Sequence, residues 1–376
     1  MYDFAVIQRL YIHNFRCLEN FELSLLEKPS ALLIGKNGAG KTTVGLALEI
    51  FQRIARGTTS VDDLLKPDDL RRRDVPIRFE IDIKLEGKSY RYHVAFELPE
   101  GSKEILVFEE WLMVGLNVAF RREQAETRLA DAYEAKNSEF LIDRRLAALP
   151  IIQERSMSDP LFIVKRWLAN MLILQPIPSV IGGDSKQETL HPNKQVANFG
   201  EWFSGILASE PSAYTKIDTY LKQIMPDLKD IKNPVVGRDA RSLEVQFSSQ
   251  QGNLVVPFGM LSDGEKCFMI CALVLAANTA YGPVFCFWDE PDNYLAMSEV
   301  GHFVLALRAA FQSGGQFIAT SHNAEAIRQF SDENTFLLYR NSHLEPTIIR
   351  PITEIRASGE LNGDLVGALI RGDVGP

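Results

Sequence analysis

Two short apolar runs interrupt the mixed pattern of the chain, and each leads into a different pattern. Ala31–Ile34 is apolar and leads into a glycine-rich stretch, after which Val44–Ile54 has apolar residues at helical spacing. Val284–Trp288 is a second apolar run, and it ends in acidic residues. Uninterrupted apolar runs of this length are typical of strands buried on both faces of a parallel sheet. The pattern therefore predicts an α/β protein.

Other parts of the chain have different periodicities. Residues 76–115 alternate between apolar and polar, which predicts antiparallel strands, and Glu86-Gly87-Lys88 is typical of a hairpin turn between two of them. Residues 116–235 are interpreted as mostly helical, without the sustained heptads of a long coiled coil. Residues 346–376 have room for one strand and a short helix or two.

The glycine-rich stretch after the first apolar run carries the clearest chemistry. Residues 35–42, GKNGAGKT, match the phosphate-loop pattern G-x-x-x-x-G-K-[ST] between a predicted strand and a predicted helix. In such a loop the backbone N–H groups point at phosphate oxygens, and the helix N-terminus adds partial positive charge. Lys41 is suited to the β- and γ-phosphates, and the Thr42 hydroxyl to Mg²⁺. We expect the nucleotide to be bound by Gly35, Asn37, Gly38, Ala39, Gly40, Lys41, Thr42 and Thr43.

The second apolar run predicts the partner half of such a site. Asp289 and Glu290 follow its last residue, and ligands of parallel sheets bind at the carboxyl ends of the strands. We expect Asp289 to hold Mg²⁺ and Glu290 to act as general base on the attacking water. His322 follows the next predicted strand, Gln316–Ala319, at the same relative position. We interpret His322 as a sensor of the γ-phosphate.

Composition narrows the class of protein. The chain has 376 residues and a net charge of -9, so as a whole it is not a basic nucleic-acid binder. No apolar run approaches the ~20 residues needed to cross a bilayer, and the N-terminus lacks a signal-peptide pattern. We therefore expect a cytoplasmic protein without a membrane partner. The four cysteines are expected to be buried free thiols.

Basic residues recur in the middle of the chain, and two interpretations of them stay open. One is a solvated face, and the other is a surface that contacts the phosphate backbone of DNA. The residues concerned are Arg71 to Arg73, Arg121, Arg122, Arg128, Arg144, Arg145, Arg155, Lys165 and Arg166.

Together the motifs resemble the ABC-type ATPases of the branch that contains the SMC proteins, RecF and the OLD-type ATPases. GKNGAGKT resembles their Walker A motif, LSDGE (residues 261–265) their signature motif, VFCFWDEP their Walker B motif and ATSHN their switch histidine. LYIHNFRCLENFELSL resembles their opening hairpin, in which Asn14-Phe15-Arg16 is typical. The four motifs occur in the order of the family, and the resembling flanks cover roughly half of the chain.

The resemblance implies an α/β P-loop NTPase with an ABC-ATPase-like head: a mixed central sheet flanked by helices, an antiparallel β-subdomain and a helical insertion. It implies four parts. These are an N-terminal lobe (1–115), a helical insertion or lid (116–235), a C-terminal lobe with signature, Walker B and switch histidine (236–345), and a C-terminal tail (346–376).

The resemblance also adds site residues and an assembly. Ser262 and Gly264 match the signature residues that contact the γ-phosphate held by another subunit, and Arg16 is assigned to the nucleotide. One copy of each motif per chain then implies at least a homodimer with shared ATP sites. Asp263 stands where transporters have glycine, and we predict that its carboxylate points away from the phosphates.

Two positions of the family pattern differ or stay open. The residue that aligns with the last aspartate of the transporter D-loop is Ala296. The glutamine of the Q-loop corresponds to either Gln153 or Gln175.

Three functions follow from this resemblance. The first is Mg²⁺-dependent ATP hydrolysis that drives ATP-gated dimerisation, in the ATPase or sensor-scaffold subunit of an anti-phage defence system with a separate nuclease or toxin as effector. The second is a RecF-like DNA-binding repair ATPase. The third is a non-catalytic scaffold that binds ATP. ATP and Mg²⁺ are the expected cofactors.

Overall fold

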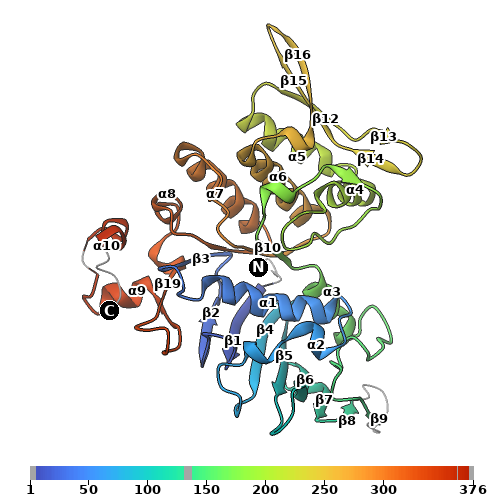
Figure 1. Cartoon of the computed structure of the whole chain (residues 1–376), viewed down its shortest axis with the longest axis vertical. Coiled ribbons are helices and arrows are strands. Elements are labelled where there is room, and N and C mark those ends of the chain that lie inside the picture. Colours follow the sequence, from blue (N-terminus) through green and yellow to red (C-terminus); the bar gives the residue numbers. More distant parts are fainter. Residues whose placement is uncertain (1–5, 131–137, 362, 372–376) are drawn as a thin grey trace. The chain divides into compact units, whose positions relative to one another are not determined.

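The computed structural model describes residues 6–130, 138–361 and 363–371. The ends of the predicted N-terminal lobe and C-terminal tail, residues 1–5 and 372–376, lie outside the described residues. The chain forms two compact units (Figure 1). One consists of Met1–Met171 and Asp332–Pro376, and the other is Leu172–Ser331.

The first unit contains an eight-stranded antiparallel sheet, in the order β2-β1-β4-β5-β6-β7-β8-β9. The alternating segment gives β4 (Ile77–Leu85), β5 (Lys88–Glu97) and β6 (Leu106–Val114). The hairpin between β4 and β5 is confirmed, and Glu86 and Gly87 both have positive φ, as its two-residue turn requires. The other strands are β1 (Val6–His13), β2 (Phe21–Ser24), β7 (Asn117–Glu123), β8 (Glu126–Leu129) and β9 (Ser138–Leu141).

The centre of the sheet buries one face because strands such as β4 have an apolar residue at every second position. In β4 the buried side chains are those of alternate residues, and they pack toward α1 (Lys41–Ala55). The Phe51 ring of α1 makes edge-to-face contacts with Phe79 and Tyr92 of the sheet. This packing holds the helix that follows the phosphate loop.

The prediction that residues 116–235 are mostly helical is wrong for the start of this segment. Strands β7 to β9 extend the antiparallel sheet through it, and the longer helices of the segment are α3 (Pro160–Ala169), α4 (Phe199–Ser209) and α5 (Ala213–Ile224). Residues 117–129 are rich in Arg and Glu, which favour helices, but pairing with the edge of β6 decides the outcome. The four-part division of the chain stays a prediction.

The first unit also holds the strands beside the phosphate loop. β3 (Ser30–Ile34) is fully buried and parallel to β19 (Thr335–Tyr339), which pairs in antiparallel fashion with β20 (Ile348–Pro351). The short helices of this unit are α2 (Val61–Leu64), α9 (Ile352–Ala357) and α10 (Leu365–Arg371), with the 3-10 turns η1 (Pro67–Asp69) and η4 (Asp332–Asn334). The prediction of one strand and one or two short helices after residue 345 is confirmed.

The second unit contains three parallel strands in the order β10-β17-β18. They are β10 (Leu172–Leu174), β17 (Phe285–Trp288) and β18 (Gln316–Thr320), and all of their residues are buried. The helices of this unit are α4, α5, α6 (Asp263–Ala280), α7 (Met297–Gln312) and α8 (Ala324–Arg328), with the 3-10 turns η2 (Pro178–Val180) and η3 (Phe258–Met260). At 18 residues, α6 is the longest helix among the described residues, which agrees with the predicted absence of a long coiled coil.

Two small antiparallel sheets complete this unit. One has the order β11-β14-β13 and the other β12-β15-β16. Their strands are β11 (Asp184–Ser185), β12 (Leu228–Lys232), β13 (Val235–Val236), β14 (Ala240–Ser242), β15 (Glu244–Ser249) and β16 (Gly252–Pro257). The predicted fold class, α/β with mixed and antiparallel sheets, is confirmed.

Candidate functional site

The phosphate loop connects β3 to α1, as its pattern predicts. Gly35, Gly38 and Gly40 have φ values of 152°, 81° and 100°, a region of backbone conformation that favours glycine. A Cβ on Gly35 would lie 2.1 Å from the carbonyl oxygen of Leu338 in β19. The loop therefore needs glycine both for its backbone conformation and for its close approach to the neighbouring strand.

Lys41 and the helix N-terminus give this loop its positive charge. The Lys41 side chain is buried, and its Nζ donates a hydrogen bond of 2.8 Å to the carbonyl oxygen of Gly35. The first turn of α1 contains no acidic residue, so nothing in that turn offsets the positive end of its dipole. Thr42 is exposed at the loop, and Thr43 Oγ1 lies 3.6 Å from Cys17 Sγ. The contacts of Lys41, Thr42 and Thr43 with a nucleotide stay a prediction.

The segment after β19 supports the outer side of the loop. Thr347 donates a hydrogen bond of 2.9 Å to the carbonyl oxygen of Ala39, and its own N–H donates to Cys17. Arg340 approaches the carbonyl oxygen of Gly38 at 3.4 Å. Sequence reasoning assigned no role to Thr347 or Arg340, because their contacts join segments about 300 residues apart.

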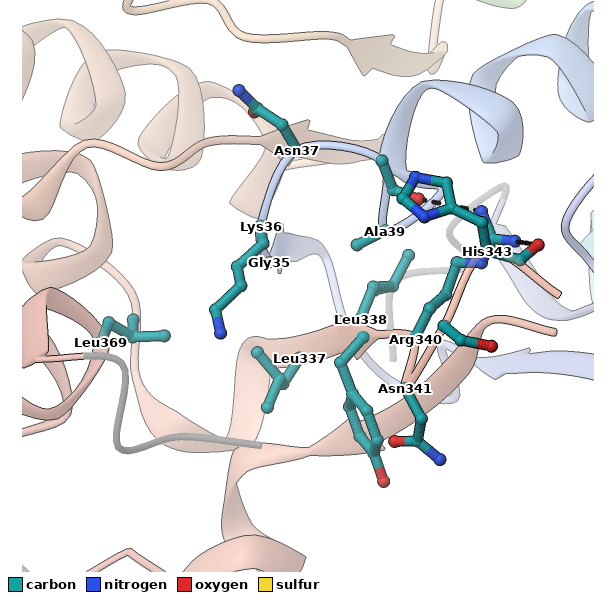
Figure 2. A pocket seen from close by; sticks show the side chains of 13 residues that line it. Gly35, Lys36, Asn37, Ala39, Leu337, Leu338, Arg340, Asn341, His343 and Leu369 are labelled. Atoms are coloured by element: carbon teal, nitrogen blue, oxygen red, sulfur yellow. Dashed lines mark hydrogen bonds between the residues drawn. The ribbon is translucent and has the colours of Figure 1, made fainter. Parts of the chain in front are cut away.

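A pocket of about 200 Å³ lies beside the loop, within the first unit. It is lined by residues 35–39, by residues 337–343 and by Leu369. Figure 2 shows Lys36 extending toward Leu337 and Leu369, whereas Asn37 points away from the pocket. The charged side chains of the lining, Lys36 and Arg340, are both basic.

Arg16, the remaining predicted nucleotide contact of the first unit, is held by Asp69. Its Nε lies 2.8 Å from Asp69 Oδ1, and its N–H donates to the Asp69 carbonyl oxygen. The Arg16 backbone has a φ of 52°, and about half of its side chain is exposed. The ion pair fixes the loop that follows β1.

In the second unit, Asp289 follows β17 and is 5% exposed. Its Oδ1 accepts a hydrogen bond of 2.6 Å from the Thr320 hydroxyl, and its Oδ2 accepts one of 3.0 Å from Gln175. Gln175 directly follows β10, and this contact identifies it, not Gln153, as the glutamine beside the acidic residue. Both carboxylate oxygens of Asp289 are therefore oriented by side chains of neighbouring strands.

Glu290 and His322, predicted from two separate motifs, lie together. Glu290 Oε1 is 3.4 Å from His322 Nδ1, and Glu290 Oε2 accepts a hydrogen bond of 2.7 Å from Asn293. The Glu290 backbone has a φ of 50°, and its N–H donates to the Thr320 hydroxyl at 2.9 Å. An exposed histidine next to a fixed carboxylate suits proton transfer and phosphate contact.

The turn after Glu290 is tied to the end of β18. Ser321 donates a hydrogen bond of 3.0 Å to Asp292. Burial raises the pKa of the Asp292 carboxyl, and the bond from Ser321 opposes this shift only in part. Periodicity alone does not predict this contact, because α7 separates Asp292 from Ser321 along the chain.

The signature segment caps α6. Ser262 is the N-cap residue: its Oγ accepts from the N–H of Glu265 and donates to Glu265 Oε2 at 2.7 Å. Gly264 approaches the chain at Tyr294, where an added Cβ would lie 3.2 Å from the carbonyl oxygen. Gly264 is the second residue of this helix. The orientation of Asp263 in a dimer stays a prediction.

Two of the middle basic residues, Arg122 and Lys165, are buried, and others form ion pairs. Arg122 is fully buried and donates to backbone carbonyls of residues 124, 142, 143 and 146. Arg144 pairs with Glu97, and Arg145 with Glu104. Lys165 is also buried, and its Nζ donates to the carbonyl oxygen of Ile152. For Arg122 and Lys165, both predicted interpretations, a solvated face and a DNA contact, are therefore wrong.

The described cysteines are free. Cys267, Cys271 and Cys286 are buried, as predicted, whereas Cys17 is half-buried. Burial raises the pKa of the Cys267 thiol to about 12, so it is protonated at neutral pH.

In the described part of the chain, no helix has the length and apolar character needed to span a membrane.

The predicted ligands of Mg²⁺ are Thr42 of the first unit and Asp289 of the second. No group of three or more His, Cys, Asp or Glu side chains within residues 6–130, 138–361 and 363–371 could hold a metal ion. Mg²⁺ at such sites is bound by one or two protein oxygens, with substrate phosphates and water completing the octahedron. Asp289 has a buried, oriented carboxylate, and Thr42 is an exposed residue with a hydroxyl, so each is chemically a donor of this kind. That the two hold one ion stays a prediction.

Comparison with solved structures shows that the fold is like that of SMC head domains. Residues 6–149 match the family of the AAA ATPase domain. Two solved structures cover almost the whole chain. One is an SMC head bound to the C-terminal winged-helix domain of ScpA, with a TM-score of 0.56, 14% identity, and coverage of 93% of this chain and 99% of that one.

The other is an Smc head domain with an extended coiled coil bound to the C-terminal domain of ScpA, derived from Pyrococcus furiosus. It has a TM-score of 0.51, 13% identity, and coverage of 95% and 99%. At these identities the likeness shows the fold. No curated protein matches the sequence significantly. The predicted fold, an α/β ATPase head like that of the SMC proteins, is confirmed.

Proposed function

We propose that the protein hydrolyses ATP in a Mg²⁺-dependent reaction. The observation that carries this proposal is the arrangement of Glu290 beside His322, next to an Asp289 carboxylate that is hydrogen-bonded on both oxygens. A protein that only binds nucleotide has no use for a positioned general base. The phosphate loop of the first unit supplies the matching binding function.

Each residue has a distinct task in the proposed reaction. The loop N–H groups and Lys41, once it leaves the Gly35 carbonyl, bind the β- and γ-phosphates. Asp289 and Thr42 would hold Mg²⁺, which when bound neutralises charge that develops on the phosphate oxygens. Glu290 takes a proton from the attacking water. His322 contacts the γ-phosphate and, through Nδ1, keeps the Glu290 carboxylate in place.

The proposed ATPase works as a homodimer that ATP closes. Ser262 and Gly264 begin α6, so its N-terminus is available to a phosphate held by a second copy. Ser262 then exchanges its hydrogen bond to Glu265 for one to that phosphate. Closing and opening of this dimer would be the conformational output.

We further propose that the chain is the ATPase or sensor-scaffold subunit of an anti-phage defence system, with a separate effector. The support is the family resemblance together with the protein partner, ScpA, that both similar head domains bind. Cells that carry this gene with its neighbouring genes should survive phage infection better than cells with the Lys41→Ala variant. Equal survival of the two strains would contradict the defence role.

The general-base assignment is tested with Glu290→Gln. We expect ATP turnover to fall by about 10²–10⁴-fold while nucleotide binding is retained, because the amide keeps the shape but accepts no proton. The matched control, Glu333→Gln, changes an exposed glutamate outside the site and should keep wild-type turnover. Turnover of Glu290→Gln at the wild-type rate would disprove the assignment. A wild-type protein that binds ATP without hydrolysing it would favour the scaffold.

A further inference from the structure

The Thr320 hydroxyl makes hydrogen bonds to both Asp289 and Glu290. It is fully buried at the end of β18, beside β17. It donates a hydrogen bond of 2.6 Å to Asp289 Oδ1 and accepts one of 2.9 Å from the N–H of Glu290. One hydroxyl therefore contacts both consecutive residues, through the side chain of one and the backbone of the other.

One of these hydrogen bonds restrains the Asp289 carboxylate, and the other restrains the backbone of Glu290. A carboxylate can rotate about its Cβ–Cγ bond, and the bond from Thr320 limits this rotation together with the bond from Gln175 on the other oxygen. The Glu290 backbone is in the left-handed region, which is unfavourable for a residue with a side chain. The Thr320 oxygen satisfies the N–H of this strained residue and thereby stabilises a conformation in which the carboxylate reaches His322.

We infer that Thr320 is a positioning residue that sets how strongly Mg²⁺ and nucleotide bind together, by fixing Asp289, and that it also holds Glu290 for catalysis. The inference rests on the proposed ATPase function. Thr320 contacts neither substrate nor metal; it acts through the two acidic residues. Groups that orient a metal-binding carboxylate typically change metal affinity or activity by 10–100-fold when they are removed.

The test uses Thr320→Val, which keeps the branched shape and the strand preference but removes the hydroxyl. The measured quantity is the dissociation constant of a fluorescent ATP analogue, with Mg²⁺ and with EDTA. We divide the dissociation constant in EDTA by the dissociation constant with Mg²⁺. In Thr320→Val we expect this ratio to fall by about 10–100-fold, because binding with Mg²⁺ weakens while binding in EDTA is unchanged. Thr320→Ser restores the hydroxyl and should bring the ratio to within about threefold of wild type.

A second buried strand threonine provides the control. Thr127 in β8 is 1% exposed, and its hydroxyl has no hydrogen-bond partner among the described residues. Thr127→Val makes the same chemical change away from the acidic residues, and it should leave the ratio unchanged. If Thr320→Val does not fold, Thr320→Cys serves in its place, because a thiol is a weak donor of similar size.

The outcomes separate this inference from the proposed function. If wild-type binding is strengthened by Mg²⁺ and Thr320→Val keeps the wild-type ratio, the inference is overturned and the ATPase proposal stands. If wild-type protein shows no effect of Mg²⁺ on nucleotide binding, both proposals are overturned. A reduced ratio that Thr320→Ser fails to restore would also overturn the role of the hydroxyl, since shape alone would then explain the loss.

Discussion

At the scale of single residues, the glycines of the first unit occupy very different surroundings. Gly40 has a φ of 100° and precedes α1, and an added Cβ would meet Thr347 Oγ1 at 2.8 Å and Cys17 Sγ at 2.9 Å. Gly57 follows the same helix with a φ of 102°, but nothing lies within 4 Å of its added Cβ. Substitutions at Gly57 and Gly40 therefore separate the effect of backbone conformation on stability from the effect of packing.

We expect Gly57→Ala to lower the stability of the protein by about 1–2 kcal/mol, from the left-handed backbone alone. Gly40→Ala adds a clash that displaces the segment around Thr347, which costs a further ~1–3 kcal/mol and weakens nucleotide binding. Thermal melts and nucleotide titrations of both variants check this. Equal melting temperatures would show that the contacts of Gly40 are relieved without cost.

A carboxylate on the antiparallel sheet makes stability depend on acid pH. Burial raises the pKa of Glu80, but the neighbouring His93 ring and Arg9 guanidinium outweigh this and lower the pKa to about 2. A depressed pKa contributes stability above the unfolded value of about 4.5, and this contribution is lost as pH falls toward 2. The wild type should therefore be more stable than Glu80→Gln above pH 5, and the difference should disappear near pH 2.

Urea melts at several pH values between 2 and 7 measure this difference. Glu100→Gln, which changes an exposed glutamate in a turn, is the control and should follow the wild-type curve. A gap between wild type and Glu80→Gln that persists unchanged at pH 2 would contradict the assignment to this carboxylate.

At the scale of elements, the start of α6 combines a structural and a proposed functional role. Ser262 and Glu265 satisfy backbone N–H groups at the helix N-terminus through a reciprocal capping box. We expect Ser262→Ala to lower the stability of the isolated chain by about 1 kcal/mol, because the N-cap acceptor is lost. Ser262→Thr keeps an acceptor and should lose only a few tenths of that value. Thermal denaturation without nucleotide, with no difference between the two variants, would contradict a capping role.

The elements also show what the sequence could and could not predict. Strands such as β3 and β17 were predictable because a short, continuous apolar run that is followed by glycine or acidic residues is typical of a buried strand. Glu290 and His322 were predictable for the same reason, since both follow such strands. Residues 117–129 were misjudged because their charged side chains fit a helix as well as an edge strand. Thr320 and Gln175 were identified only by contacts between strands that sequence periodicity does not specify.

At the scale of the whole molecule, the proposed dimer has a direct measurement. Glu290→Gln with Mg²⁺ and ATP should elute at twice the chain mass of 42.3 kDa, because ATP binds but is not hydrolysed. Without ATP it should elute at the chain mass. Light scattering coupled to size-exclusion chromatography gives both values. Lys41→Ala is the control and should keep the chain mass in both conditions; a constant mass for Glu290→Gln would contradict ATP-gated assembly.

The first unit is built from two stretches of chain, and this has a consequence for synthesis on the ribosome. Gly35 contacts the carbonyl oxygen of Leu338, and Ala39 accepts a hydrogen bond from Thr347, so the phosphate loop depends on residues translated about 300 positions later. At ~5–20 residues per second, the nascent loop waits roughly 15–60 s for its supporting strand. Leu172–Ser331 is continuous and emerges completely within that interval. A nascent chain is thus unable to complete its phosphate loop, the proposed ATP site, until residues 335–347 have been translated.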